Sequence, residues 1–474
     1  MRSETMSQPA ETLRADVLVV GAGIAGLQAS LDLADQGKTV LLVERQPSIG
    51  GRMINLSKVF PTLDCASCIT TPRMASVAHH PNIRLLTYTE VSSIDKVEGV
   101  FHARVTRKPR YIDEQQCIGC RRCEEACTTY LPDEYDHGLG ARKAISIPFT
   151  NAIPQLPVLD MENCLLCGSC AKACPADCID FLQQPRPVEL EADAVILTTG
   201  FDLTELGAKK QYGGASYPNV LSPLQMERLL APHGPYGSVL RPSDGKKPDS
   251  IAFVQCAGSR DQSLGVPYCS RVCCMYAIKQ AMLLSGSLPI ADITIYYMDI
   301  RAFGKGYEQF YQNARAMGIE FVKAKVGRIR EDEEHNAILR IERQEDGGRP
   351  EEVTHDLVVL SLGMVPAWKP TEGGMIPVEA GTDGFIRCPK AKVSPTLTSL
   401  EGVFAAGTAI GPKDIVDSIV DAGAAAMEAA SYLEQRSSVR RHTPDVARAL
   451  PQSGPGPLEA AVTGAVLAGA GEGN

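Results

Sequence analysis

Ala15-Asp-Val-Leu-Val-Val-Gly-Ala-Gly-Ile-Ala-Gly26 is the stretch that decides the fold. Its first half is an apolar run typical of a buried strand, and Leu27 to Gln36 continue as a helix. A second strand is expected at Thr39 to Val43, and Glu44 follows it directly. Strand, glycine loop, helix, strand and acid in this order predict a βαβ unit that binds a dinucleotide.

The glycines and the acid of this motif have separate roles. Gly21 permits the tight turn, Gly23 lets a pyrophosphate approach the backbone at the helix N-terminus, and Gly26 completes the fingerprint. Glu44 is placed to bind a pair of ribose hydroxyls. FAD and NAD share this fingerprint, so the motif alone leaves the cofactor open.

Three later motifs resemble those of flavoproteins with two dinucleotide-binding domains. They are Gly50-Gly51-Arg52, the strand and turn Ala194-Val-Ile-Leu-Thr-Thr-Gly200, and the C-terminal Gly402-Val-Phe-Ala-Ala-Gly-Thr408, where Thr408 replaces the usual Asp. Their order favours FAD over NAD at the first site. The residues expected to bind FAD are Gly21, Gly23, Gly26, Glu44, Arg45, Gly51, Arg52, Thr199, Gly200, Gly407, Thr408 and Ile415.

Ile415 belongs to a segment, Gly411-Pro-Lys-Asp-Ile415, that precedes a small-residue helix expected at 418–430. The positive end of that helix dipole is suited to stabilising electron density on a flavin. An ordinary Asp-capped helix is the alternative.

An insert at residues 111–182 carries two similar cysteine runs. Both runs have the Cys-x2-Cys-x2-Cys-x3-Cys spacing of bacterial two-cluster ferredoxins. By that pattern one [4Fe–4S] cluster is held by Cys117, Cys120, Cys123 and Cys174, and the other by Cys164, Cys167, Cys170 and Cys127. Cys178 is left over, and we expect it to pack beside the first cluster.

A third group of thiols follows the strand-like run Ser250 to Gln255, where a second nucleotide loop is expected. The segment reads Cys256-Ala-Gly-Ser-Arg-Asp and then Tyr268-Cys-Ser-Arg-Val-Cys-Cys274. Thiolates are soft ligands for Fe–S clusters or zinc. The pattern therefore favours a metal cluster in place of a nicotinamide, with packed thiols as the alternative.

Cys65 and Cys68 form a separate Cys-x2-Cys pair downstream of the second glycine pair. Two interpretations stay open for a catalytic role: a dithiol that shuttles electrons near the flavin, or half of a cluster site completed by another element or another protein of a complex. Two buried structural thiols are a third possibility.

Composition restricts the function classes. The chain has 474 residues and a formal net charge of −9, which argues against a nucleic-acid surface. Residues 1–13 hold no apolar run typical of a secretory signal, and no run reaches the length of a membrane-spanning helix. Sixteen cysteines in a chain expected in the reducing cytoplasm indicate metal ligation.

These motifs predict an α/β flavoprotein with two dinucleotide-binding domains, similar to thioredoxin and glutathione reductases, and an inserted two-cluster ferredoxin domain. The expected segments are a disordered leader at 1–14, a discontinuous FAD-binding domain at 15–110, 183–203 and 376–435, the insert at 111–182, a second Rossmann-like domain with its own cluster at 204–375, and a flexible tail at 436–474.

Over about residues 15–430 the chain resembles the A-type subunits of heterodisulfide reductase. The most specific segments run from Cys256 to Lys279, from Tyr297 to Glu308 and from Gly411 to Ile415. The resemblance implies a [4Fe–4S] cluster near the flavin, which makes three clusters in all, with the ligands Cys256, Cys269, Cys273 and Cys274. It also implies an FAD at which electron paths branch, in some members by bifurcation.

We therefore expect an electron-transfer oxidoreductase subunit of a larger complex. The resemblance implies partners that are B- and C-type heterodisulfide reductase subunits, quinone-linked subunits, or hydrogenase- or dehydrogenase-linked subunits, and a homodimer within the complex. The alternative is a self-sufficient NAD(P)H oxidoreductase, which needs a second glycine loop. An assembly scaffold with structural clusters is a third possibility.

Overall fold

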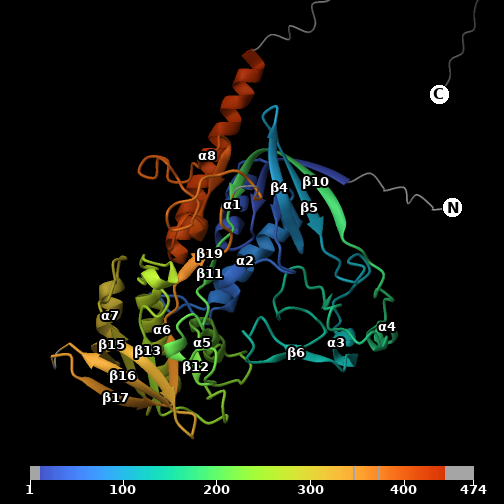
Figure 1. Ribbon diagram of the computed structural model, residues 1–474. Coiled ribbons are helices and arrows are strands. Elements are labelled where there is room, and N and C mark those ends of the chain that lie inside the picture. The colour runs from blue at the N-terminus through green and yellow to red at the C-terminus, as the bar shows by residue number, and fades with distance from the viewer. Residues whose placement is uncertain (1–10, 345–346, 372–373, 443–474) are drawn as a thin grey trace, which may run out of the picture. The chain divides into compact units, whose positions relative to one another are not determined.

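The computed structural model describes residues 11–344, 347–371 and 374–442 (Figure 1). Contacts divide the chain into Met1–Leu433 and Glu434–Asn474. The described part of the second unit is the end of one helix, so the account below concerns the first unit.

The first sheet has seven strands and is assembled from three separate regions of the sequence. Its order is β3-β2-β1-β10-β5-β4, and β20 also pairs with β10. β10 is long enough to pair with antiparallel β5 along its first part and with parallel β20 along its last three residues. The strands are β1 (Glu11–Val20), β2 (Val40–Val43), β3 (Ile83–Leu86), β4 (Thr89–Val97), β5 (Val100–Arg107), β10 (Arg186–Leu197) and β20 (Val403–Ala405).

Helices α1 (Ile24–Asp35) and α8 (Ile415–His442) contribute to one hydrophobic core on this sheet. α8 presents a row of alanines, including Ala422, Ala425 and Ala429, to that core. Small side chains let packed helices approach closely. The remaining helical elements near the sheet are η1 (Gly51–Asn55), α2 (Ala66–His79) and η4 (Gly407–Ile410).

The second sheet also has seven strands, in the order β12-β18-β13-β14-β15-β16-β17. Its first five strands are parallel and the last two extend it antiparallel. They are β12 (Val220–Leu221), β13 (Ser250–Val254), β14 (Asp292–Tyr297), β15 (Glu320–Glu331), β16 (Ala337–Arg343), β17 (Pro350–His355) and β18 (Leu357–Leu360).

One face of the second sheet shares a core with α5 (Pro223–Leu230), α6 (Cys273–Ser287) and α7 (Tyr307–Ala316). Residues alternate between the two faces, so Ile251 and Phe253 face these helices whereas Ala252 and Val254 belong to the opposite core. The short pair β11 (Phe201–Leu203) and β19 (Met364–Pro366) lies in the two connections between the sheets, and η2 (Lys210–Tyr212) and η3 (Gln262–Leu264) lie in loops.

The insert between β5 and β10 has little regular structure. It contains α3 (Arg122–Ala126), α4 (Ser169–Ala173), and the strand pairs β6 (Tyr130–Pro132) with β7 (Ala141–Lys143) and β8 (Ile145–Ser146) with β9 (Val158–Leu159). Both helices begin after a residue with positive φ, at Arg121 and Gly168. The repeated geometry agrees with the repeated cysteine spacing.

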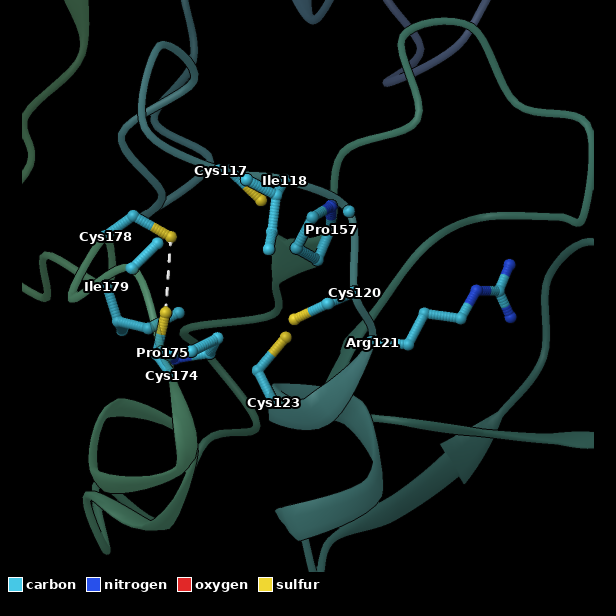
Figure 2. Close-up of a pocket in the computed structure, with 12 residues that line it drawn as sticks. Cys117, Ile118, Cys120, Arg121, Cys123, Pro157, Cys174, Pro175, Cys178 and Ile179 are labelled. Atoms are coloured by element: carbon cyan, nitrogen blue, oxygen red, sulfur yellow. Dashed lines mark hydrogen bonds between the residues drawn. The ribbon is translucent and has the colours of Figure 1, made fainter.

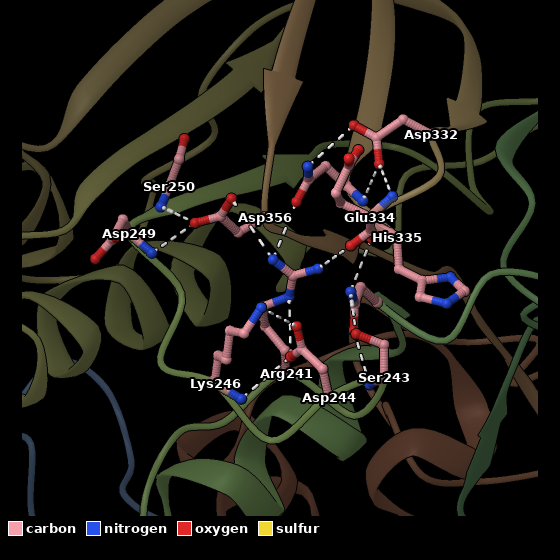
Figure 3. Close-up of polar contacts among 12 residues, drawn as sticks. Arg241, Ser243, Asp244, Lys246, Asp249, Ser250, Asp332, Glu334, His335 and Asp356 are labelled. Atoms are coloured by element: carbon pink, nitrogen blue, oxygen red, sulfur yellow. Dashed lines mark hydrogen bonds and ion pairs between the residues drawn. The ribbon is translucent and has the colours of Figure 1, made fainter.

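The loop before β13 is held by the buried side chain of Arg241 (Figure 3). Its guanidinium donates to the Asn336 side chain at 3.0 Å and to the Glu334 carbonyl at 2.6 Å, in the turn between β15 and β16. Nearby, Asp356 accepts the backbone N–H groups of Asp249 and Ser250 at 2.6 and 3.0 Å. The two bonds from Arg241 connect this loop to the turn between β15 and β16 of the second sheet.

The two ends of the chain differ from the sequence expectations. Residues 11–14, predicted as leader, form the start of β1, because β1 pairs along its whole length with β10. α8 begins three residues before the helix predicted at 418–430 and runs to His442, so the predicted tail at 436–474 begins as helix. The rest of both predictions, at 1–10 and 443–474, lies outside the described residues.

The other predicted domain limits stay predictions. Among the helices that the structure describes, none is both long and apolar enough to cross a membrane.

Candidate functional site

The glycine loop after β1 lies against the second glycine pair. Gly51 has φ of +58°, and a methyl group on it would lie 2.7 Å from Gly23 Cα. Two backbone turns that meet without side chains leave a surface that a pyrophosphate can approach closely. Gly21 lies in the same loop, and Gly26 lies in the first turn of α1, which begins at Ile24.

Glu44 lies at the end of β2, where the fingerprint requires the acid. One carboxylate oxygen accepts the backbone N–H of Ala22 at 2.7 Å, and the other accepts that of Gln46 at 2.8 Å. Burial raises the pKa of Glu44, and these two bonds oppose the rise. A carboxylate has about four acceptor positions, so two remain for ribose hydroxyls.

The remaining residues predicted to bind FAD lie in several different elements. Thr199 and Gly200 follow β10, and the Thr199 hydroxyl is buried with no hydrogen-bond partner among the described residues. A buried hydroxyl without a partner is costly, which fits a polar ligand at this turn. Gly407 and Thr408 open η4, Ile415 begins α8, Arg52 forms an ion pair with Asp202, and Arg45 is exposed.

Four thiols gather at the carboxyl edge of the second sheet. Cys256 follows β13, and Cys273 and Cys274 are the first two residues of α6. Burial is the main cause that raises the pKa of Cys273, and three neighbouring thiols add to it, those of Cys274, Cys256 and Cys269. The structure thus brings together the residues between Cys256 and Cys274 that the sequence singled out.

The surroundings of these thiols suit an anionic cluster. Cys273 and Cys274 lie at the N-terminus of α6, where the helix dipole stabilises negative charge. Burial raises the pKa of the Cys256 thiol, and Arg260 beside it opposes that rise. Burial raises the pKa of Cys274 to about 11. Burial disfavours free thiolates at this site, whereas cationic iron would balance the negative charge of the sulfurs that bind it.

The glycine in the loop after β13 is packed closely against protein atoms. A methyl group on Gly258 would lie 1.9 Å from the Thr204 hydroxyl and 2.8 Å from the Gly363 nitrogen. Thr204 is in turn fixed by bonds with Gly363, whose N–H donates to its hydroxyl at 3.1 Å. Gly258 therefore does not offer the open backbone found at Gly23, where an added methyl group would lie 3.9 Å from the nearest protein atom.

The insert places its cysteines in two crossed groups. An open pocket is lined by Cys117, Cys120, Cys123 and Cys174, together with Cys178 (Figure 2). In the other group, burial raises the pKa of Cys170, and the thiols of Cys164 and Cys127 raise it further. Each group thus combines thiols from one run with the last cysteine of the other run, while Cys167 is exposed.

The arrangement of the thiols in the insert and after β13 does not fit a single metal ion. Within the described residues, no three His, Cys, Asp or Glu side chains are placed to hold one ion. A [4Fe–4S] cluster differs because each of its four thiolates binds a different iron. All sixteen cysteines are free thiols in the structure, and none forms a disulfide.

Cys65 and Cys68 lie at the start of α2. The Cys65 sulfur caps the helix by accepting the backbone N–H of Cys68 at 3.3 Å. Its pKa is lowered, chiefly by the hydrogen bond from the Cys68 side chain, and Cys68 is exposed. A helix N-terminus favours a thiolate. The geometry agrees with a redox pair and equally with half of a cluster site, so both interpretations stay open.

A buried ion pair that the sequence did not indicate joins this region to α6. Lys279 of α6 pairs with Glu227 of α5, and its amine also donates to the Lys58 carbonyl at 2.8 Å. The second oxygen of Glu227 accepts from the backbone and hydroxyl of Ser57 at 3.0 and 2.8 Å. The contact connects the segment before Cys65 with the helix that begins at Cys273.

We expect Lys279→Met to lower the free energy of unfolding by about 3–5 kcal/mol, because it leaves Glu227 buried without its cation. Both residues are 1% exposed, and this burial lowers the pKa of Lys279. Equilibrium urea unfolding under anoxic conditions measures the effect. The double variant Lys279→Met/Glu227→Gln should recover part of the loss; equal stability of the single variant and wild type would contradict the prediction.

Comparison with known proteins identifies two matching domains. Residues 16–64 match the family model described as FAD dependent oxidoreductase, and residues 116–179 match the 4Fe-4S dicluster domain. The fold is similar to thioredoxin reductase from T. acidophilum, with a TM-score of 0.50 and 16% identity over 89% of this chain and 99% of that one. Thioredoxin reductase from Lactococcus lactis gives the same TM-score at 14% identity, with the same coverage of both chains.

Three curated relatives are much closer in sequence, and all three are A-type subunits of heterodisulfide reductases. The iron-sulfur protein of this type from the CoB–CoM heterodisulfide reductase of Methanocaldococcus jannaschii is 44% identical over 90% of this chain and 65% of its own length. The second such protein of Methanopyrus kandleri is 47% identical over 89% and 66%. The one from the H(2):CoB-CoM heterodisulfide,ferredoxin reductase of Methanothermobacter marburgensis is 44% identical over 87% and 63%. The chain spans slightly less than two thirds of these relatives.

Proposed function

We propose that the chain is a member of the family of A-type heterodisulfide reductase subunits. In this proposal it is an oxidoreductase subunit that transfers electrons between FAD and [4Fe–4S] clusters within a larger complex. The observation that carries this proposal is the four-thiol group at the carboxyl edge of the second sheet. In the related two-domain fold this edge is where a second dinucleotide is expected.

FAD fits the first site. The meeting of Gly23 with Gly51 leaves bare backbone for the pyrophosphate, and Glu44 keeps acceptors for the ribose. The Thr199 hydroxyl, unpartnered among the described residues, offers a further polar contact. When bound, FAD exchanges electrons in pairs or singly, while iron–sulfur clusters exchange single electrons.

Three clusters fit the thiols. We assign two to the insert, held by the ligands that the spacing predicts, and the third to Cys256, Cys269, Cys273 and Cys274. The protein's role at each is to fix the sulfurs and to set the reduction potential through burial, charge and hydrogen bonds. At the third site the start of α6 and Arg260 both favour negative charge on the group.

The group of thiols after β13, where a second nucleotide loop would lie, argues against the alternative, a self-sufficient NAD(P)H oxidoreductase. Electrons then come from and go to other subunits. We propose B- and C-type heterodisulfide reductase subunits, or quinone-, hydrogenase- or dehydrogenase-linked subunits, as partners, and a homodimer within the complex. The many reduced thiols fit the cytoplasm.

Anaerobic isolation of the native complex tests this function. We expect about twelve iron atoms per FAD, the content of three [4Fe–4S] clusters, and no bleaching of the flavin by NADH or NADPH alone. Clusters with a purely structural role would leave the EPR spectrum unchanged on reduction with dithionite. About eight iron atoms per FAD would remove the third cluster, and rapid bleaching by NADH or NADPH would favour the alternative.

A further inference from the structure

Cys178 is a fifth thiol at a site that needs four. Its side chain is only 4% exposed, it lines the same cavity as Cys117, Cys120, Cys123 and Cys174, and its sulfur lies 3.4 Å from the Cys174 sulfur. Figure 2 shows this contact as a dashed line, with the sulfur atoms turned toward a common space. The ferredoxin spacing gives Cys178 no ligand role.

The backbone holds this thiol on the same small scaffold as the ligands. The Cys178 carbonyl accepts the Asp113 N–H at 2.7 Å, and the Asp113 carbonyl accepts the Cys117 N–H at 3.0 Å. An isolated antiparallel bridge between Ile112 and Ile179 joins the backbone segments that precede Asp113 and follow Cys178. Cys178 therefore has a fixed place next to the cluster site.

The chemistry decides which sulfur is the donor. Between two free thiols either sulfur can donate, but a cysteine bound to iron is a thiolate without a proton. With a cluster in place, Cys174 is the acceptor and the S–H of Cys178 is the donor. This step rests on the proposed assignment of Cys174 as a ligand.

We propose that Cys178 positions a hydrogen bond on the ligand sulfur of Cys174 and thereby raises the reduction potential of the cluster at the Cys117 site. Reduction adds one negative charge to a cluster. A donor to a ligand sulfur stabilises that charge more in the reduced than in the oxidised state, so hydrogen bonds to sulfur raise the potential.

The other half of the insert has a different residue at the matching position. Cys127 corresponds to Cys174, and the residue four positions later is Leu131, which has no side-chain donor. The Cys127 sulfur instead faces the carbonyl oxygen of Thr129 at 3.8 Å, which only accepts. The Cys127 site has other contacts at its sulfurs: the Leu166 N–H donates to the Cys164 sulfur at 3.3 Å, and the Ser169 hydroxyl lies 3.4 Å from the Cys167 sulfur. The hydrogen bond from Cys178 is therefore specific to the last cysteine of the Cys117 site.

The test is an EPR-monitored redox titration of the anaerobic native complex with Cys178→Ala and Cys178→Ser. For Cys178→Ala we expect one ferredoxin-type signal to move to lower potential, with a three- to tenfold change in the reduced-to-oxidised ratio, where tenfold corresponds to about 59 mV. Cys178→Ser keeps a donor and should hold the wild-type potential or exceed it. Cys388→Ala, which removes a thiol outside every cysteine run, should change neither signal.

Unchanged potentials in Cys178→Ala would overturn the proposal, and so would an equal fall in Cys178→Ser. Loss of four iron atoms in both variants would also overturn it, since Cys178 would then be a ligand. Iron counted in the wild-type sample separates this result from failure of the proposed function: a wild type without the ferredoxin clusters contradicts the function, whereas an intact wild type with unresponsive variants contradicts only the role of Cys178.

Discussion

Cys273→Ala is expected to remove one of three clusters and to leave the rest of the protein intact. Cys273 is 5% exposed at the first position of α6, and its sulfur faces the Leu362 carbonyl at 3.6 Å. A carbonyl oxygen is a poor substitute for a soft thiolate at iron. The iron content should fall from about twelve to about eight per FAD.

Metal analysis and flavin absorbance of the anaerobic variant measure this effect together. FAD content and the two ferredoxin signals should stay at the wild-type level, because the predicted ligands of those clusters come from the insert. Cys388→Ala is the matched control, since Cys388 is also a partly buried thiol but lies outside every cysteine run. Retention of about twelve iron atoms in Cys273→Ala would exclude Cys273 as a ligand.

Local spacing carried most of what the sequence predicted correctly. The strand predicted at Thr39 to Val43 is observed as β2 (Val40–Val43), because an apolar run acts over a few residues. The same holds for the glycine loop, which lies between β1 and α1 as the fingerprint requires. In this loop, residues that are adjacent in the sequence are sufficient to predict the binding site.

Contacts between residues that are far apart in the sequence could not be predicted from the spacing of motifs. Glu227 accepts from Ser57, which is 170 positions away, and nothing in the pattern of α5 or α6 marks Glu227 or Lys279 as buried. Cys178 was predicted only as a packed thiol, since its distance to Cys174 depends on a turn with positive φ at Asp177. The predicted end of α8, at residue 430, was also wrong. The helix runs to His442, and the small residues and arginines that follow residue 430 include no signal that ends a helix.

Gly23→Ala is expected to abolish most FAD binding without disturbing the fold. Gly23 has φ of −74° and ψ of −176°, an extended conformation that alanine adopts without strain. The closest protein atom to an added methyl group is Gly51 Cα, at 3.9 Å, which is ordinary contact. The added methyl group would therefore clash with the pyrophosphate of the cofactor but not with protein atoms.

The flavin retained after purification, measured against protein, should fall at least about tenfold, a loss of about 1.4 kcal/mol or more in binding. Thermal unfolding of the FAD-free variant should match that of FAD-free wild type. Gly286→Ala in α6, where a methyl group meets no atom within 4 Å, is the neutral control. Wild-type flavin content in Gly23→Ala would place the pyrophosphate away from this loop.

Gly26→Ala supplies the contrast that makes the result specific. A methyl group on Gly26 would lie 1.9 Å from the Gly21 carbonyl oxygen, so this variant damages the loop itself. It should lower both the flavin content and the unfolding temperature of the FAD-free protein. The two glycine-to-alanine variants thus distinguish two roles. Gly26 is required for the fold, and Gly23 is required for the approach of the ligand.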